Sequence, residues 1–137
     1  MKAVFADTFY RIALTNPRDG FHDRVLEFSR SLRPQFIVTT DEVLTELLTF
    51  SAADPQLRLE ASLVVNDVLA DENVRVIPQT RRSSLAGFAL YQSRPDKGYS
   101  LTDCSSMETM RREGLTDVLT NDKHFEQEGF RALFRDS

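Results

Sequence analysis

Residues 2–8, Lys-Ala-Val-Phe-Ala-Asp-Thr, place a short apolar segment directly before an acid and a hydroxyl residue. The segment Lys2–Ala6 is partly β-branched and is closed by polar residues, a pattern that is typical of a buried strand. Asp7 and Thr8 belong to the residue types that favour a helix N-cap. The stretch therefore predicts a strand that ends where a helix cap begins, with Asp7 at the junction.

Four further short apolar segments resemble the first one, and longer segments with a 3.6-residue period separate them. The expected strands are 36–38, 74–77, 118–119 and 130–134. The expected helices are 21–32, 40–52, 56–70, 80–92 and 102–113. Because strands alternate with helices, we expect an α/β fold in which helices cover both faces of a central parallel sheet, a three-layer α/β/α sandwich.

The size of the chain suits one such unit. It has 137 residues, of which 41% are hydrophobic, and it contains no internal repeat and no linker rich in Pro, Gly or Ser. A chain of this length buries about two thirds of its unfolded surface and needs no disulfide or metal to fold. We therefore expect residues 1–137 to form a single domain.

Cysteine usage and hydropathy bear on location. Cys104 is the only cysteine in the sequence, which excludes an intramolecular disulfide and any multi-cysteine metal site. Asp7 interrupts the first apolar segment before a secretory signal can form, and no apolar run approaches the roughly 20 residues that span a bilayer. We expect a soluble, cytoplasmic protein with no membrane contact.

The net charge is −4. A protein that wraps nucleic acid by overall charge is strongly basic, so this class is excluded. Any polyanion that the chain binds has to be met by a local cluster of cations or through metal ions.

The helix expected after residues 36–38 has a recognisable start. Thr39 can cap it, and Glu42 stands three residues later, which is the capping-box spacing. Glu46 falls at the margin of the apolar stripe of this helix, so we expect it to be neither fully exposed nor part of the core. The stripe consists of Val43, Leu44, Leu47 and Leu48.

The last long helix begins near Ser100, where either Ser100 or Thr102 can serve as the cap and Asp103 lies in the first turn. On this helix we expect the apolar side to turn inward and the two arginines to reach solvent. The inward residues are Cys104, Met107 and Met110, and the arginines are Arg111 and Arg112.

Four acids occupy comparable places in this scheme: Asp7, Glu46, Asp103 and Asp122. Ligands of open α/β sheets bind beyond the carboxyl ends of the strands, so Asp7 and Asp122 are expected to share one cleft, which Asp103 can join. Two carboxylates about 5 Å apart repel each other by about 3 kcal/mol at an effective dielectric constant near 20. A divalent cation relieves that repulsion, and ligands that are all oxygen favour Mg²⁺ or Mn²⁺.

Each acid also has a purely structural explanation. Asp7 and Asp122 can cap the turns that follow them, and Asp103 can stabilise a helix dipole. Glu46 can be a solvated residue on a helix flank, and Glu42 is assigned mainly to the capping box. The joint placement of the four acids favours the metal centre.

At these residues the chain resembles the PIN-domain ribonucleases, and among them the VapC-type toxins of VapBC toxin–antitoxin pairs. The resemblance spans nearly the whole chain, and no one of its elements is specific by itself. The matching segments are Val4–Thr8, Thr40–Leu48, Tyr99–Met107 and Leu119–Phe125, followed by Gly129 and Phe130.

The resemblance implies a PIN-like fold and an endoribonuclease that hydrolyses RNA phosphodiester bonds with Mg²⁺ or Mn²⁺. It also implies a homodimer and inhibition by a small cognate antitoxin. Carried over residue by residue, the catalytic and metal-binding acids are Asp7, Glu46, Asp103 and Asp122. Thr8 and Thr102 match hydroxyl positions beside that site.

Phosphate attraction requires local cations, because the net charge is negative. The candidates for lining an RNA path are Arg81, Arg82, Lys97, Arg111, Arg112 and Lys123. Each of them can equally be a solvated surface residue.

Other chemistries have less support. His22 and His124 are the only histidines and are far apart in sequence, so a zinc site is not expected, and we expect His124 to be structural or to lie behind the site. No nucleophile elbow, P-loop or Rossmann glycine motif is present. The alternative function is a non-catalytic α/β interaction module that acts through a dimer or partner interface.

Overall fold

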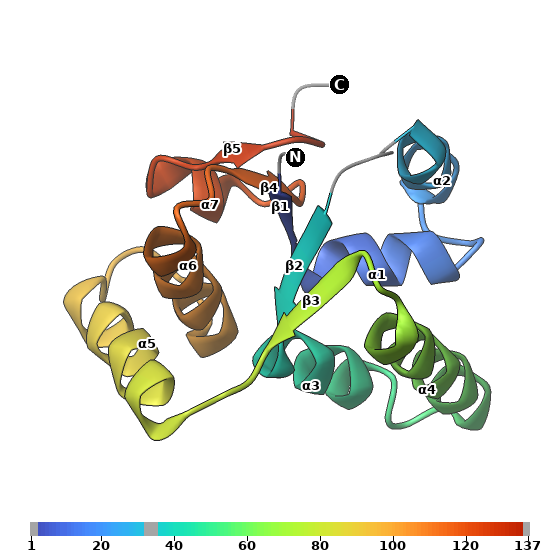
Figure 1. Ribbon diagram of the computed structural model, residues 1–137, viewed down its shortest axis with the longest axis horizontal. Helices are drawn as coiled ribbons and strands as arrows, with labels where there is room; N and C mark the ends of the chain where they lie inside the picture. The colour runs from blue at the N-terminus through green and yellow to red at the C-terminus, as the bar shows by residue number, and fades with distance from the viewer. Residues whose placement is uncertain (1–2, 32–35, 136–137) are drawn as a thin grey trace.

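A computed structural model describes residues 3–31 and 36–135 and places five strands in one parallel sheet (Figure 1). The strand order is β3-β2-β1-β4-β5, and each neighbouring pair runs parallel. Phe5 of β1 pairs with Val38 of β2 on one side and with Val118 of β4 on the other. The strands are β1 (Ala3–Ala6), β2 (Phe36–Thr40), β3 (Val74–Ile77), β4 (Asp117–Leu119) and β5 (Arg131–Ala132).

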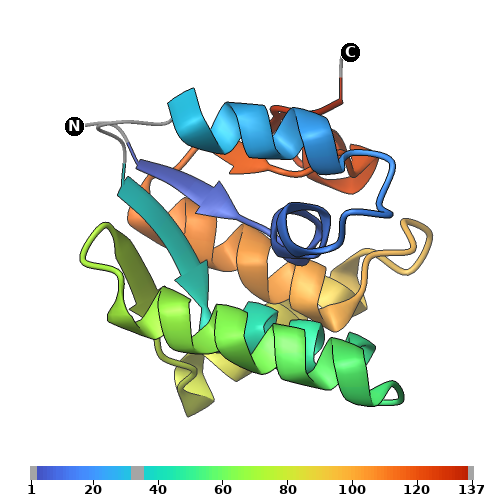
Figure 2. The same ribbon diagram turned by 90° about the vertical axis from the view of Figure 1, so that its right-hand side faces the viewer.

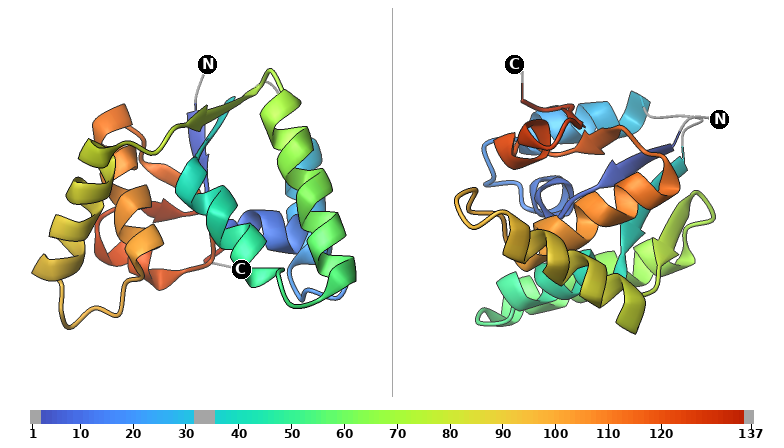
Figure 3. Two further views of the ribbon diagram at one scale, coloured as in Figure 1. Left: turned by 90° about the horizontal axis from the view of Figure 1, so that it is seen from below. Right: turned by 90° about the vertical axis from the view of Figure 1, so that its left-hand side faces the viewer.

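Helices cover both faces of this sheet. They are α1 (Thr8–Thr15), α2 (His22–Ser31), α3 (Asp41–Phe50), α4 (Pro55–Ala70), α5 (Arg81–Ser93), α6 (Leu101–Glu113) and α7 (Lys123–Gln127). Figure 2 shows α1, α2 and α4 on one side, and the right-hand view of Figure 3 shows α5 and α6 on the other. The expected three-layer α/β/α sandwich with a central parallel sheet is confirmed. Helix α3 contacts α1, α4 and α6, so it joins the two outer layers.

Alternate residues of the central strand supply two separate cores. Phe5 packs with Met107 and Met110 of α6, whereas its neighbours Val4 and Ala6 pack in the core that contains α1 and α2. Successive side chains of a strand point to opposite faces, and a parallel sheet buries both faces. This is why β1 is a continuous apolar run instead of an alternating one.

Most of the expected elements are present within a few residues of their predicted bounds. Two helices lie outside the predicted helix ranges, α1 and α7, although the helix cap predicted at Asp7 is the N-cap of α1. The apolar pattern of α1 is obscured because Arg11 is buried along with Tyr10 and Ala13, and α7 is too short to show a period. Lys2 and Leu32, which the predicted segments included, lie outside the described residues.

The predicted start of α3 is wrong by one residue. Thr40 is the N-cap and accepts a hydrogen bond from the backbone of Val43, whereas Thr39 lies in β2 and its hydroxyl donates to the carbonyl of Ala6. Glu42 therefore closes no capping box, because it stands two residues after the true cap. Leu48, which was expected in the apolar stripe, is 40% exposed.

Helix α6 follows the prediction closely. Ser100 is its cap, in a reciprocal capping box with Asp103. Cys104, Met107 and Met110 are fully buried. Among the described residues, no helix is long and apolar enough to cross a membrane.

Helices α5 and α6 approach closely at Gly87. A Cβ atom at this position would lie 2.5 Å from the Ser105 hydroxyl oxygen and 3.2 Å from the Ser105 Cα. A backbone atom at that distance cannot be moved by rotating a side chain, so any larger residue has to push the helices apart.

We therefore expect Gly87→Val to lower the free energy of unfolding by about 2 kcal/mol, the usual cost of overpacking a tight contact. Urea denaturation measures this loss. Ala89→Val is the control, since Ala89 is exposed on the same helix and the variant adds the same β-branched side chain. Equal losses in the two variants would contradict the close-packing argument.

Candidate metal centre

The sheet order creates a switch point beside β1. The chain moves from β1 to β2 and β3 on one side and then returns to β4 on the other. Ala6 pairs with Leu119, so the carboxyl ends of β1 and β4 lie next to each other. In open α/β sheets the crevice at such a point is where ligands bind.

Asp7 leaves β1 at this crevice. It is 6% exposed, and its Oδ2 accepts a hydrogen bond of 3.0 Å from the hydroxyl of Thr120, the residue after β4. Its other oxygen, Oδ1, is shielded from solvent and has no hydrogen-bond partner. A buried carboxylate oxygen without a donor is costly, and this oxygen is available to a cation.

Glu46 reaches the same crevice from α3. Its Oε1 accepts a hydrogen bond from the hydroxyl of Thr8 in the first turn of α1. Because α3 contacts both α1 and α6, Glu46 lies between the two layers that carry Asp7 and Asp103.

Asp103 and Asp122 complete the cluster. The backbone N–H of Ser100 donates to Oδ2 of Asp103 at 3.0 Å, and the backbone N–H of His124 donates to Oδ1 of Asp122 at 2.9 Å. Asp122 is thus a helix cap, as the structural alternative proposed, Asp103 is the second member of a capping box, and both also face the imidazole of His124. Its Nδ1 is 3.5 Å from Asp103 Oδ2 and 3.3 Å from Asp122 Oδ1.

The pKa values of two of these acids are shifted by the charges of the others. Burial raises the pKa of Asp7 from 3.8 to about 7, and the charges of Asp103 and Glu46 add to the rise. Burial also raises the pKa of Asp103, with contributions from the charges of Asp122 and Glu46. The four acids named from the sequence therefore lie in one electrostatic cluster.

The donor set fits a hard divalent cation. Carboxylate oxygens are the ligands that Mg²⁺ and Mn²⁺ prefer, and a cation favours the charged form of Asp7, which burial and the neighbouring acids disfavour. Asp103, Asp122 and His124 each offer one ligand atom within 4.8 Å of the others. Of the four acids, Asp103 and Asp122 thus stand at ligand spacing with His124, and the charges of Asp7 and Glu46 act on this group.

An open groove of about 370 Å³ extends from Glu46 between α3, α5 and α6. Its lining contains several hydroxyl groups and no lysine or arginine. The lining residues are Glu42, Thr45, Glu46, Thr49, Gln79, Ser84, Leu101, Thr102 and Ser105. Thr102 therefore lies beside the centre, in the groove, and Thr8 lies beside it through its hydrogen bond to Glu46.

The candidate cations divide into two groups. Lys123 follows Asp122 directly, and the loop of Lys97 passes His124, because a Cβ at Gly98 would be 3.8 Å from the imidazole. Arg81 and Arg82 begin α5, and Arg82 shares a hollow with Arg112 at the end of α6 opposite to Asp103. Lys123 thus adjoins one of the acids and the loop of Lys97 adjoins His124, whereas Arg82 lies toward the other end of α6.

The contacts of Thr120 and His124 with the acids were not predicted from the sequence. Their signal was the segment Thr120-Asn-Asp-Lys-His124, in which polar residues recur at every second position after a strand. That spacing alone does not show that the hydroxyl reaches Asp7 across the sheet or that the imidazole meets Asp103.

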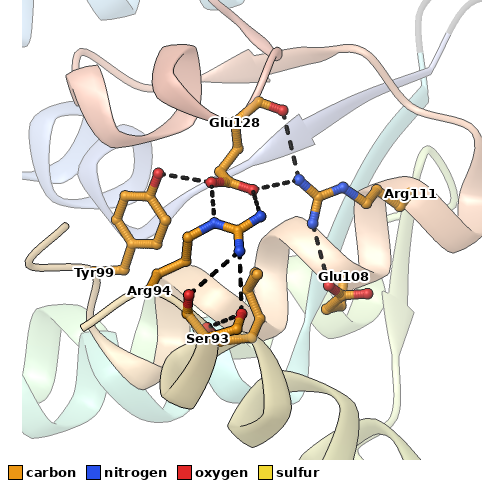
Figure 4. Close-up of polar contacts among 7 residues, drawn as sticks. Ser93, Arg94, Tyr99, Glu108, Arg111 and Glu128 are labelled. Carbon is orange, nitrogen blue, oxygen red and sulfur yellow. Dashed lines mark hydrogen bonds and ion pairs between the residues drawn. The ribbon is translucent and has the colours of Figure 1, made fainter. Parts of the chain in front are cut away.

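An ion network fixes α7 against α5 and α6 (Figure 4). Glu128 follows α7, and its carboxylate accepts hydrogen bonds from Arg94, Arg111 and the hydroxyl of Tyr99. Although burial by itself raises the pKa of Glu128, these bonds lower it to about 2. Tyr99 in turn packs its ring edge-on to His124, with centroids 5.2 Å apart. The network thereby holds the imidazole beside the acids.

The fold and the acidic cluster together define a class of structure, a three-layer α/β/α domain with carboxylates at the switch point of its parallel sheet. No family model matches the sequence, and no curated protein matches it. Solved structures do match. A Mycobacterium tuberculosis protein, VapC20, described as a toxin that cleaves the sarcin–ricin loop, is 24% identical with a TM-score of 0.82, over 93% of this chain and 95% of that chain.

Two more distant structures agree with this placement. VapBC2 from Rickettsia felis, bound to a DNA fragment of its promoter, is 14% identical with a TM-score of 0.66, over 95% of this chain and 96% of that one. FitAcB from Neisseria gonorrhoeae is 14% identical with a TM-score of 0.63, over 94% of this chain and 95% of that chain. The chain has the fold of these toxin–antitoxin proteins.

The raised pKa of Asp7 predicts that the free energy of unfolding changes with pH. Its pKa in the folded state, about 7, lies above the ordinary value of 3.8, so the folded state holds the proton more tightly. The stability of the metal-free protein should fall as the pH rises from about 4 to about 7. We expect Asp7→Asn to be the more stable protein at pH 8, by up to roughly 4 kcal/mol, and to match the wild type at pH 4.

Urea denaturation in the presence of a chelator, from pH 4 to pH 8, measures this difference. Asp67→Asn serves as the control, because Asp67 is exposed on α4 and should show no pH-dependent gain. A gain from Asp7→Asn that is the same at every pH would contradict the electrostatic origin of the effect.

The Glu128 network, beyond the C-terminal end of α7, predicts a loss of stability when its carboxylate is removed. Glu128→Gln leaves two arginines without their carboxylate and should lower stability by about 2 kcal/mol. The pKa of Glu128 is lowered from 4.5, so its contribution is present above pH 4.5 and is lost as the pH falls toward 2. Glu126→Gln, which breaks an exposed pair with Arg135, should cost less than about 0.5 kcal/mol. Thermal denaturation at pH 7 compares the two, and similar losses would refute the role of the network.

Proposed function

We propose that this protein is a metal-dependent endoribonuclease and the toxin of a type II toxin–antitoxin pair. The observation that carries the proposal is the meeting of four acids from four parts of the chain at the switch point of the sheet. Asp7 is the strongest of them, because it is buried and one of its oxygens has no donor. Structural caps do not require a buried, unpartnered carboxylate.

Asp7, Glu46, Asp103 and Asp122 would hold Mg²⁺ or Mn²⁺ at this point. When bound, such an ion activates water and stabilises the charge on a phosphodiester in hydrolysis. The protein contributes the fixed placement of the carboxylates. Thr120 orients Asp7 and Thr8 orients Glu46, while capping interactions orient Asp103 and Asp122.

The RNA would cross the acids along a path that the remaining features suggest. Lys97 on the loop before α6 and Lys123 at the start of α7 are the candidates to attract phosphates beside the centre. The groove beside Glu46 carries no cation and several hydroxyl groups, so it suits a base or ribose of an unpaired strand. Arg81 and Arg82, at the start of α5, would contact only a longer RNA.

The comparisons support the biological setting of the proposal. VapC20 is described as a toxin that cleaves the sarcin–ricin loop, and another similar structure is VapBC2 bound to a DNA fragment of its promoter. We propose a cytoplasmic homodimer that a small cognate antitoxin inhibits. Exposed apolar side chains offer surface for these partners, and they include Leu59, Leu63 and Leu69 on α4 and Leu85, Phe88 and Tyr91 on α5.

The same exposed apolar side chains favour the second candidate, a non-catalytic interaction module. In that function the acids are caps and the working surface is the interface alone. The module needs no metal, so metal binding separates the two candidates.

We expect Mg²⁺ or Mn²⁺ at a hundredfold excess over its dissociation constant to raise the thermal midpoint by about 5–10 °C. The purified protein should cleave single-stranded RNA in the same buffer. Asp122→Asn keeps an equally good helix cap, yet it should reduce cleavage by about a thousandfold and reduce the metal-induced shift.

Gel-based cleavage assays and differential scanning fluorimetry provide the two readouts. Asp67→Asn, which removes an exposed acid from α4, should cleave RNA and bind metal like the wild type. A wild-type protein that neither binds the cations nor cleaves any RNA would refute the nuclease and leave the interaction module.

A further inference from the structure

His124 presents a nitrogen atom to the acids that no hydrogen bond uses. Its Nδ1 is shielded from solvent and has no hydrogen-bond partner. It lies 3.3 Å from Asp122 Oδ1 and 3.5 Å from Asp103 Oδ2. A neutral or charged imidazole that merely supported the carboxylates would be expected to form a good hydrogen bond to one of them.

These separations match the spacing of ligands around a common ion. Ligands about 2.2 Å from a metal lie about 3.1 Å apart at the adjacent corners of an octahedron and about 3.6 Å apart in a tetrahedron. The two observed distances fall within that interval, and the three donor atoms all lie within 4.8 Å of one another. An ion can therefore bind all three groups with little movement of the side chains.

The surrounding residues hold the imidazole in this orientation. The backbone N–H of His124 is bonded to Asp122, and the ring of Tyr99 packs edge-on against the imidazole. Tyr99 is itself fixed by Glu128, which two arginines clamp (Figure 4). Metal-binding histidines are commonly fixed by supporting contacts of this kind.

We propose that Nδ1 of His124 is a direct metal ligand beside Asp103 and Asp122, and that it makes the centre prefer Mn²⁺ to Mg²⁺. This inference rests on the proposed function, because it concerns the ion that the nuclease would use. The preference follows from the donor types, since Mg²⁺ favours sites made of oxygen and water, whereas transition-metal ions bind imidazole nitrogen well.

The presence of exactly two histidines allows a sharp test. Pulsed electron paramagnetic resonance of the Mn²⁺-loaded full chain should detect a directly bound nitrogen. The signal should persist in His22→Gln, because His22 is committed to a contact of 2.8 Å between its Nδ1 and the carbonyl of Ala13. It should disappear in His124→Gln.

Calorimetry provides a second readout that does not depend on activity. We expect His124→Gln to weaken Mn²⁺ binding by about tenfold or more, while Mg²⁺ binding changes by less than about threefold. His22→Gln should leave both affinities unchanged. If His124→Gln does not fold, wild-type protein labelled with ¹⁵N only at histidine should show the nitrogen coupling of ¹⁵N in place of ¹⁴N.

The outcomes separate this inference from the proposed function. Mn²⁺ that binds with no nitrogen coupling, or with equal losses for the two cations in His124→Gln, overturns the role of His124 and leaves an oxygen-only metal centre intact. A wild-type protein that binds neither Mn²⁺ nor Mg²⁺ overturns the metal-dependent nuclease itself.

Discussion

The repulsion among four carboxylates is the constraint on which the functional end of this molecule depends. Asp7 is fixed there by the end of β1, deep enough that burial and neighbouring charges raise its pKa to about 7. An arrangement of this kind lowers the stability of the protein alone, and it is tolerable because the two cores on either side of the sheet are large and closely packed. A cation would convert that cost into binding energy.

Each acid also accepts a hydrogen bond from a neighbouring group in the fold, so the carboxylates are positioned before any ligand binds. Thr120 donates to Asp7 and Thr8 donates to Glu46, while backbone N–H groups donate to Asp103 and Asp122. The donors lie in α1, in α7, directly after β4 and directly before α6. A centre that is held in this way does not have to reorganise when a ligand binds, which is the main contribution that a protein makes to such chemistry.

Much of the fold could be predicted from local pattern. The strands of the sheet and the cap of α6 at Ser100 follow from apolar runs and hydroxyl residues that act on their immediate neighbours. The misses have physical causes. Arg11 is buried by tertiary packing and hides the pattern of α1. Thr39 and Thr40 are chemically equivalent caps, and only the tertiary structure decides that the Thr39 hydroxyl donates to Ala6 while the Thr40 hydroxyl caps α3.

The sequence by itself determined the chemistry of the candidate site, because residue types carry charge and ligand preference wherever they lie, and the four acids were named from it. Only the tertiary structure decided which groups meet. The strand order places Thr120 against Asp7 across 113 positions of sequence, and the Glu128 network turns His124 toward the acids while Arg82 is left at the far end of α6. Distances between residues remote in sequence depend on how the layers pack, and no local pattern encodes them.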